Sequence, residues 1–154
     1  QSLFAQHPAV EFQEGLPDVS KFDGSEPVLL IIDDLMNEIN SDTEKIFTRM
    51  SHHRNISVVF IMQNLFPKNK FARTMSLNAH YMVLFKNPRD AGQFAVLAKQ
   101  MYPNSSKFAV EAYKDATDCP YGYLLLDMKP ETNERFRLRT NIFPEENTCV
   151  YIKK

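Results

Sequence analysis

The sequence has 154 residues, a length typical of one domain. Hydrophobic residues make up 44% and charged residues 24%, a globular composition that argues against a disordered or low-complexity chain. Lysine and arginine number 18 against 19 acidic residues, which gives a net charge of −1. This balance excludes a uniformly basic protein that coats nucleic acid, but it leaves room for a local basic patch.

We expect neither a membrane span nor a signal peptide in these residues. Its longest uninterrupted apolar run, 28–32, is much shorter than the about 20 residues that a membrane span needs. Cys119 and Cys149 are too few for a disulfide framework and lack metal-ligand spacing. We therefore expect an intracellular protein with free thiols and no membrane contact. Because the first residue is not Met, we also expect this chain to be a piece of a longer protein.

The first half of the chain predicts a lead-in followed by two buried strands. Residues 1–26 are polar and rich in turn residues, with one short strand expected at 10–12. The apolar run 28–32 predicts a central strand buried on both faces, and 57–62 predicts a second buried strand. Between them, Ser41 and Glu44 match a capping box, which predicts the start of a helix.

The second half predicts helices between further strands. A strand is expected at 80–85, a helix from Asn87-Pro88, and another helix from Ser105. Further strands are expected at 121–127, 135–139 and 149–152. The middle one is expected to be half-exposed, because its arginines alternate with apolar residues.

This alternation of strands and helices predicts the α/β class, with a mostly parallel sheet and helices on both faces. We expect one partial domain over residues 1–154. In such sheets, ligands bind at the carboxyl ends of the strands. Asp33 and Asp34 follow the first strand, and Gln63 and Asn64 follow the second.

The strongest chemical signal is the segment VLLIIDDLM, residues 28–36. An apolar strand that ends in a carboxylate is the Walker B pattern of nucleotide hydrolases, because a rigid strand holds the acid against a phosphate-bound Mg²⁺. Asp33 would be the magnesium-binding acid, and Asp34 would polarise the attacking water. The alternative interpretation is a solvated strand end, since many strands of α/β proteins finish in Asp.

The second strand adds an amide to this pair of acids. The segment FIMQN, residues 60–64, ends in Gln63, whose amide can hydrogen-bond both a phosphate oxygen and the attacking water. Alone, a glutamine that caps a strand end is the simpler interpretation. Two acids on one strand and an amide on the next form a more specific combination.

Residues 51–90, SHHRNISVVFIMQNLFPKNKFARTMSLNAHYMVLFKNPRD, resemble the genome-packaging ATPases of the FtsK–HerA superfamily, with the closest resemblance to those of Polinton/Maverick elements and adintovirus-like DNA viruses. The similarity extends from about residue 10 to the C-terminus. It implies a P-loop NTPase fold of the additional-strand class. It also implies a homo-oligomeric ring that hydrolyses ATP with Mg²⁺ and moves double-stranded DNA into a capsid. By position, Asp33 and Asp34 match the Walker B acids and Gln63 matches the sensor.

The chain departs from that family in one large respect, because no G-x-x-x-x-G-K-[ST] motif occurs in it. Without that loop, nothing in these residues cradles the phosphates. The resemblance therefore implies the C-terminal part of the ATPase, which lacks the P-loop strand and is inactive alone. In the family that strand lies between the Gln63 strand and the Tyr121 strand. Its absence predicts unpaired strand edges and a chain that is marginal, pairs with another chain or packs differently.

Several cations are candidates for contacts with phosphates. A ring ATPase needs a charge donated across the subunit boundary, and Arg54 is the first candidate, ahead of Arg73 and Arg89. Two basic clusters are candidates for DNA contacts. The first consists of Lys68, Lys70 and Arg73, and the second consists of Arg135, Arg137 and Arg139. Surface salt bridges or a solvated face are the alternative for all of them. The adjacent His52 and His53 do not predict a metal site, since neighbouring side chains point apart.

Three functions remain open from the sequence. The first is a DNA-translocating ATPase with a capsid or portal partner, which acts in a virus-infected cell or nucleus or in the virion. The second is a decayed or domesticated fragment without activity that serves as a DNA-binding or oligomerisation module. The third is an unrelated α/β enzyme that uses Asp33 and Asp34 in another reaction. No further motif in the sequence supports this third function.

Overall fold

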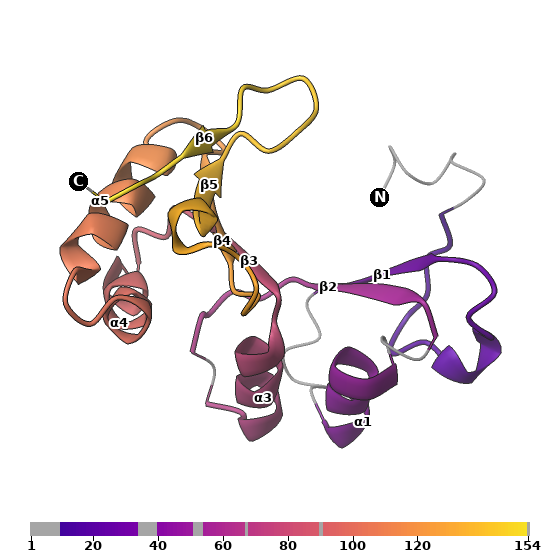
Figure 1. The fold of residues 1–154 in the computed structure, drawn as a ribbon. Coiled ribbons are helices and arrows are strands. Elements are labelled where there is room, and N and C mark those ends of the chain that lie inside the picture. Colours follow the sequence, from indigo (N-terminus) through magenta and orange to yellow (C-terminus); the bar gives the residue numbers. More distant parts are fainter. Residues whose placement is uncertain (1–9, 34–39, 51–53, 67, 90, 154) are drawn as a thin grey trace. The chain divides into compact units, whose positions relative to one another are not determined.

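The structure is a computed structural model that describes residues 10–33, 40–50, 54–66, 68–89 and 91–153 (Figure 1). The chain divides into two compact units, Gln1–Asn78 and Ala79–Lys154. Each unit has its own sheet, and we describe each unit separately.

The first unit contains a two-stranded parallel sheet. The strands β1 (Val28–Ile32) and β2 (Ile56–Phe60) pair in register from Val28 opposite Ile56 to Ile32 opposite Phe60. Both strands lie where the apolar runs predict them. The prediction of a central strand buried on both faces was wrong, because Leu29 and Ile31 are 61% and 57% exposed.

The covered face of this sheet packs against short helices. The 3-10 helix η1 (Val19–Lys21), the helix α1 (Ser41–Lys45) and the π-helical turn η2 (Ile46–Met50) precede β2, and α3 (Lys70–Asn78) follows it. Val19, Ile46 and Ile56 form one buried cluster, with Leu30 and Val58 packed on it. A second cluster is formed by Ala72 and Met75, against which Phe60 packs. Alternate residues of each strand thus supply the core.

Two local predictions in this unit need correction. The N-cap of α1 is Asn40, whose side chain accepts hydrogen bonds from the backbone of Asp42 and Thr43, so the capping box is Asn40–Thr43 and not Ser41–Glu44. Residues 10–12 form no strand. The helix α3 was not predicted at all.

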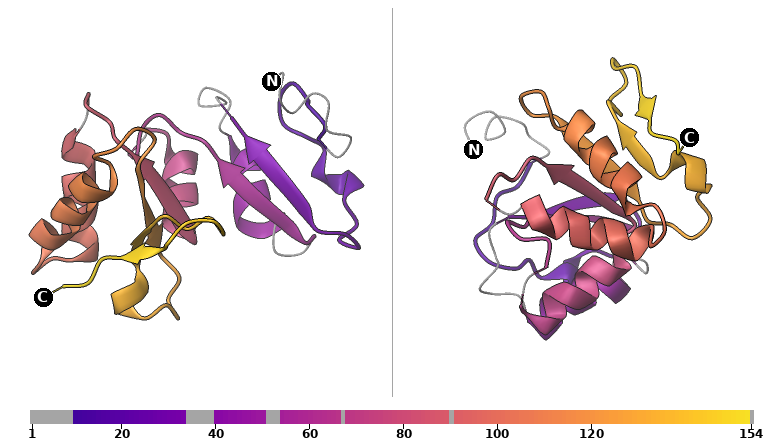
Figure 2. Two further views of the ribbon diagram at one scale, coloured as in Figure 1. Left: turned by 90° about the horizontal axis from the view of Figure 1, so that it is seen from above. Right: turned by 90° about the vertical axis from the view of Figure 1, so that its left-hand side faces the viewer.

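The second unit contains a four-stranded antiparallel sheet of order β3-β4-β5-β6. The strands are β3 (Tyr81–Phe85), β4 (Tyr123–Asp127), β5 (Leu138–Thr140) and β6 (Cys149–Val150). The helices α4 (Ala91–Met101) and α5 (Ser106–Ala116) pack on each other through stacked rings of Phe94 and Tyr113, whose centroids are 4.4 Å apart. Figure 2 shows both helices on one side of this sheet. Leu124, Leu126 and Leu138 fill the core.

The prediction of a mostly parallel sheet of the P-loop type was therefore wrong. Among the described strands only β1 and β2 pair in parallel, whereas β3–β4, β4–β5 and β5–β6 pair antiparallel. The physical reason lies in the connections. One helix between two strands returns the chain to the start of the first strand and gives a parallel pair. Two mutually packed helices, α4 and α5, bring it back at the other end, so β4 enters antiparallel to β3.

Two further boundaries in the second unit differ from the expectation. The helix α4 begins at Ala91 rather than at Asn87-Pro88. The expected strand 135–139 is instead the 3-10 helix η3 (Glu134–Phe136) followed by β5, so the arginines at 135, 137 and 139 do not line one strand face.

Candidate functional site

The carboxyl edge of the β1–β2 sheet brings together two of the residues predicted from the sequence. The ladder continues one step past the strands, because the Ile61 amide donates to the Ile32 carbonyl at 2.9 Å. Asp33 directly follows Ile32, and Gln63 lies two residues beyond Ile61. Both side chains are exposed, and among the residues that the structure describes no side chain pairs with either of them. Asp34 lies outside the described residues.

An exposed carboxylate at a strand end can hold one kind of metal complex. Mg²⁺ keeps several waters and takes one or two protein carboxylates together with nucleotide phosphates. The described residues contain no group of three or more His, Cys, Asp or Glu side chains that could hold a metal by themselves.

Arg54 lies at the other end of β2. Its Nη1 donates to the Val19 carbonyl at 2.7 Å and to the Phe22 carbonyl at 3.1 Å, which ties the lead-in segment to the start of the strand. The five residues of β2 span about 17 Å between Arg54 and the carboxyl edge. Arg54 is thus too far from Asp33 to serve the same site, and action on a neighbouring subunit would require it to release two hydrogen bonds.

The cluster of Lys68, Lys70 and Arg73 lies around the first turn of α3. All three side chains are exposed, and Lys70 Nζ lies 4.8 Å from the Phe71 ring centre. The first turn has no acidic residue, so these cations add to the positive end of the helix dipole. The segment that begins at Gln63 leads into this turn. The signal that sequence reasoning missed was Asn69, whose side chain accepts from the Phe71 amide at 2.8 Å as a helix cap.

The second basic cluster is largely used inside its own unit. Arg137 donates through Nε to Glu134 Oε1 at 2.7 Å and through Nη1 to the carbonyls of Asp127 and Lys129. Arg139 Nη2 lies 2.6 Å from Asp127 Oδ2. Only Arg135 in this cluster is an exposed residue. Two of the three guanidinium groups therefore hold the sheet together.

Asp127 is a buried acid that the sequence analysis did not single out. It ends β4 after a run of apolar residues, is 3% exposed, and accepts hydrogen bonds from Thr132 Oγ1 and the Lys129 amide as well as from Arg139. Burial acts to raise the pKa of Asp127, but these hydrogen bonds and the Arg139 charge outweigh it and hold the pKa below its ordinary value. Here an apolar strand that ends in Asp serves packing rather than chemistry.

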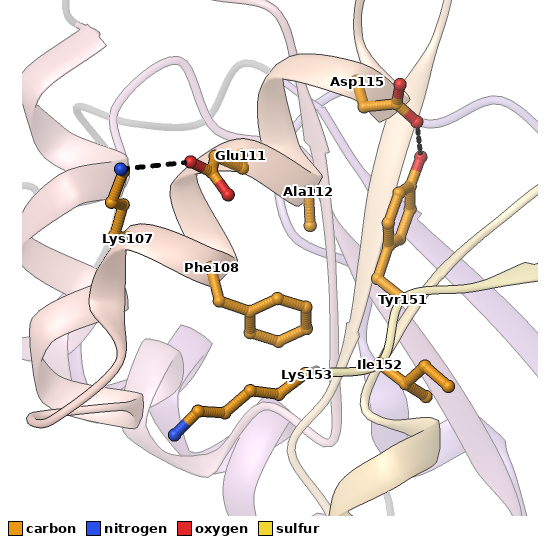
Figure 3. A pocket seen from close by; sticks show the side chains of 8 residues that line it. All are labelled: Lys107, Phe108, Glu111, Ala112, Asp115, Tyr151, Ile152 and Lys153. Atoms are coloured by element: carbon orange, nitrogen blue, oxygen red, sulfur yellow. Dashed lines mark hydrogen bonds and ion pairs between the residues drawn. The ribbon is translucent and has the colours of Figure 1, made fainter.

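A groove of about 530 Å³ lies between α5 and the last residues of the chain (Figure 3). Phe108 and Ala112 from α5 and Ile152 from the C-terminal segment form its apolar lining. The segment is fastened to α5 by a hydrogen bond of 2.6 Å from Tyr151 Oη to Asp115 Oδ2. Burial and the neighbouring Asp115 raise the pKa of Tyr151, so its hydroxyl remains the donor. No predicted site residue lies in this groove.

Comparisons with protein-family models, with curated proteins and with solved structures gave no match to this chain. No helix among the described residues is long and apolar enough to cross a membrane.

Proposed function

We propose that this chain is part of an ATPase that moves double-stranded DNA into a viral or transposon-encoded capsid. The proposal rests on the resemblance of residues 51–90 to packaging ATPases of the FtsK–HerA superfamily. The observation that carries it is the parallel pairing of β1 and β2, which brings Asp33 and Gln63 to one edge of the first unit. Such an edge is where ligands bind to parallel strands.

Each of these residues has a distinct part in the proposed reaction. Asp33 would hold the Mg²⁺ of a magnesium–ATP complex, and the ion would neutralise charge that develops on the phosphates. Asp34 would accept a proton from the attacking water. Gln63 would orient that water and contact a phosphate oxygen through its amide.

Hydrolysis also needs a group that cradles the phosphates. None of the four glycines, at 15, 24, 92 and 122, begins a G-x-x-x-x-G-K-[ST] motif. The proposal therefore requires that a phosphate-binding loop comes from a segment outside these 154 residues. Alone, the chain should bind ATP weakly or not at all.

Contact with DNA is proposed for the basic cluster on α3. Lys68, Lys70 and Arg73 are exposed cations at a helix N-terminal turn, an arrangement that suits phosphates and brings no sequence readout. Arg135 is a further candidate. The working assembly would be a homo-oligomeric ring that acts with a capsid or portal component, in an infected cell or nucleus or in the virion.

The test uses the full-length gene product together with single substitutions. Asp34→Asn should abolish ATP hydrolysis while magnesium–ATP binding, measured by calorimetry, stays unchanged. Gln63→Ala should lower turnover on the order of a hundredfold, which is the scale of a lost positioning group. Asp118→Asn in the second unit serves as the matched control and should leave turnover unchanged. Unchanged hydrolysis in Asp34→Asn would remove that acid from the mechanism and with it the proposal.

A second candidate function is a DNA-binding or oligomerisation module without hydrolysis. It is favoured by the absence of a phosphate-binding motif in the sequence. DNA affinity that persists without nucleotide in a full-length product that hydrolyses no ATP would favour this module over the motor.

A further inference from the structure

The groove beside α5 has fixed walls. On one side, the Phe108 ring makes an edge-on contact with the Tyr102 ring, with centroids 6.0 Å apart. On the other side, the Tyr151 amide donates to the Leu138 carbonyl at 2.9 Å, and the Tyr151 hydroxyl holds Asp115. Binding in the groove therefore needs little reordering of its walls, which lowers the entropic cost of association.

The charges around the groove are separated by sign along the helix. Figure 3 shows Lys107 and Lys153 toward the same end of the groove, one on either side of the Phe108 ring, with Asp115 and the Tyr151 hydroxyl beyond Ala112 toward the other end. Lys107 does pair with Glu111, but at 3.7 Å and with the Lys107 side chain 91% exposed this contact is weak. The groove thus has a cationic end and an anionic end, about 12 Å apart along α5.

A surface with this polarity is complementary to itself. When a second copy is turned by a two-fold axis across α5, its Asp115 end meets the Lys107 and Lys153 end of the first copy, and the reverse holds on the other side of the axis. Ala112 is small and leaves room over the helix, so the Phe108 ring of each copy could pack on the Ala112 of the other.

We propose that this groove is a homodimer interface in which two copies pack α5 against α5 in antiparallel orientation. The inference does not depend on the proposed ATPase activity. The contact is short, so the dimer should be weak and dissociate in the micromolar range.

Sedimentation velocity of the whole chain tests whether this homodimer forms. Concentrations from about 5 to 500 µM span the affinity expected of a small interface. The wild-type chain should pass from monomer to dimer. Two double variants each change the charge at one end of the groove. Lys107→Glu with Lys153→Glu makes the lining acidic. Glu111→Lys with Asp115→Asn makes it basic while keeping an acceptor for the Tyr151 hydroxyl.

Each reversed variant alone should dimerise at least about tenfold more weakly, because like charges then face each other across the axis. An equimolar mixture of the two should form a heterodimer at least as tight as the wild-type dimer. The matched control, Lys21→Glu with Lys99→Glu, has the same net charge as the acidic variant but leaves the groove intact. It should dimerise like the wild type and should bind the basic variant more weakly than the acidic variant does, because only one end of its groove is complementary to that variant.

A second substitution tests the apolar part of the interface. Ile152→Asp places a charge in the groove close to the C-terminus, where the side chain is 59% exposed and a change should not disturb folding. It should abolish the dimer, with an unchanged far-UV circular dichroism spectrum as the check on the fold. A wild-type chain that stays monomeric at the highest concentration, or an Ile152→Asp variant that dimerises normally, would overturn the proposal.

Discussion

The ion pair between Asp127 and Arg139 allows a quantitative test of what holds the second unit together. Asp127 is 3% exposed, and its carboxylate accepts from Arg139 Nη2 at 2.6 Å, Thr132 Oγ1 at 2.9 Å and the Lys129 amide at 3.2 Å. Asp127→Ala would leave all three donors without this acceptor. Loss of one partner of a buried pair costs about 3–5 kcal/mol. This is a large part of the about 5–15 kcal/mol that stabilises a domain.

Asp127→Asn is the more informative change, because it removes the charge and keeps the shape. The amide oxygen can still accept from Thr132 and Lys129, whereas the amide nitrogen would face Arg139, donor against donor. The lost charge-assisted hydrogen bond predicts a cost of about 2 kcal/mol in the free energy of unfolding. Urea denaturation at pH 7, followed by far-UV circular dichroism and tyrosine fluorescence since the chain has no tryptophan, measures this.

The contribution of Asp127 to the free energy of unfolding should depend on pH in one direction. The pKa of Asp127 in the folded chain lies below the ordinary value of 3.8. Its contribution is therefore complete above pH 3.8 and is lost as the pH falls through the lower, folded-state pKa. The difference between wild type and Asp127→Asn should be constant near neutral pH and shrink in strong acid. A cost below about 0.5 kcal/mol at pH 7, the range of ordinary surface substitutions, would refute this account of the ion pair.

The remaining predictions concern backbone geometry, a helix cap and the basic cluster. A Cβ at Gly122 would lie 2.5 Å from the Ala116 carbonyl oxygen, so Gly122→Ala should destabilise the second unit by about 1–3 kcal/mol in urea denaturation. Asn40→Ala removes the cap of α1 and should cost about 1 kcal/mol, whereas Asn40→Ser should cost little. If the α3 cluster contacts DNA, changing Lys68 and Lys70 together to Ala should reduce the salt dependence of DNA binding by about two units of slope, and an unchanged slope would exclude these contacts.

Local patterns were enough to predict where most strands lie. The strands expected at 28–32 and 80–85 form β1 and β3 with bounds within one residue of the expectation. Ser105 precedes α5 as expected. These features depend on neighbouring residues only, and so the sequence contains them directly.

The direction in which strands pair depends on residues far apart in the sequence. The sheet was expected to be mostly parallel because each strand–helix alternation was interpreted as one crossover, but α4 and α5 form a packed pair between β3 and β4 and reverse the direction. The three arginines at 135, 137 and 139 were expected on one face of a half-exposed strand, because only their alternation with neighbouring residues was visible in the sequence. Nothing local shows that Arg139 will meet Asp127, which lies on another strand.

The candidate site was predictable only in part, and the comparison of two similar strands shows why. Asp33 directly follows the apolar strand β1 and Asp127 is the last residue of the otherwise apolar strand β4, so the pattern alone does not separate them. The difference lies in their surroundings. Asp127 is buried in an antiparallel sheet with three donors, whereas Asp33 is exposed at the carboxyl edge of a parallel pair, where no described side chain neutralises it. A carboxylate that has no partner among the described residues can take a cation brought by a ligand. The difference in surroundings makes Asp33, rather than Asp127, the residue to test in the proposed magnesium–ATP site.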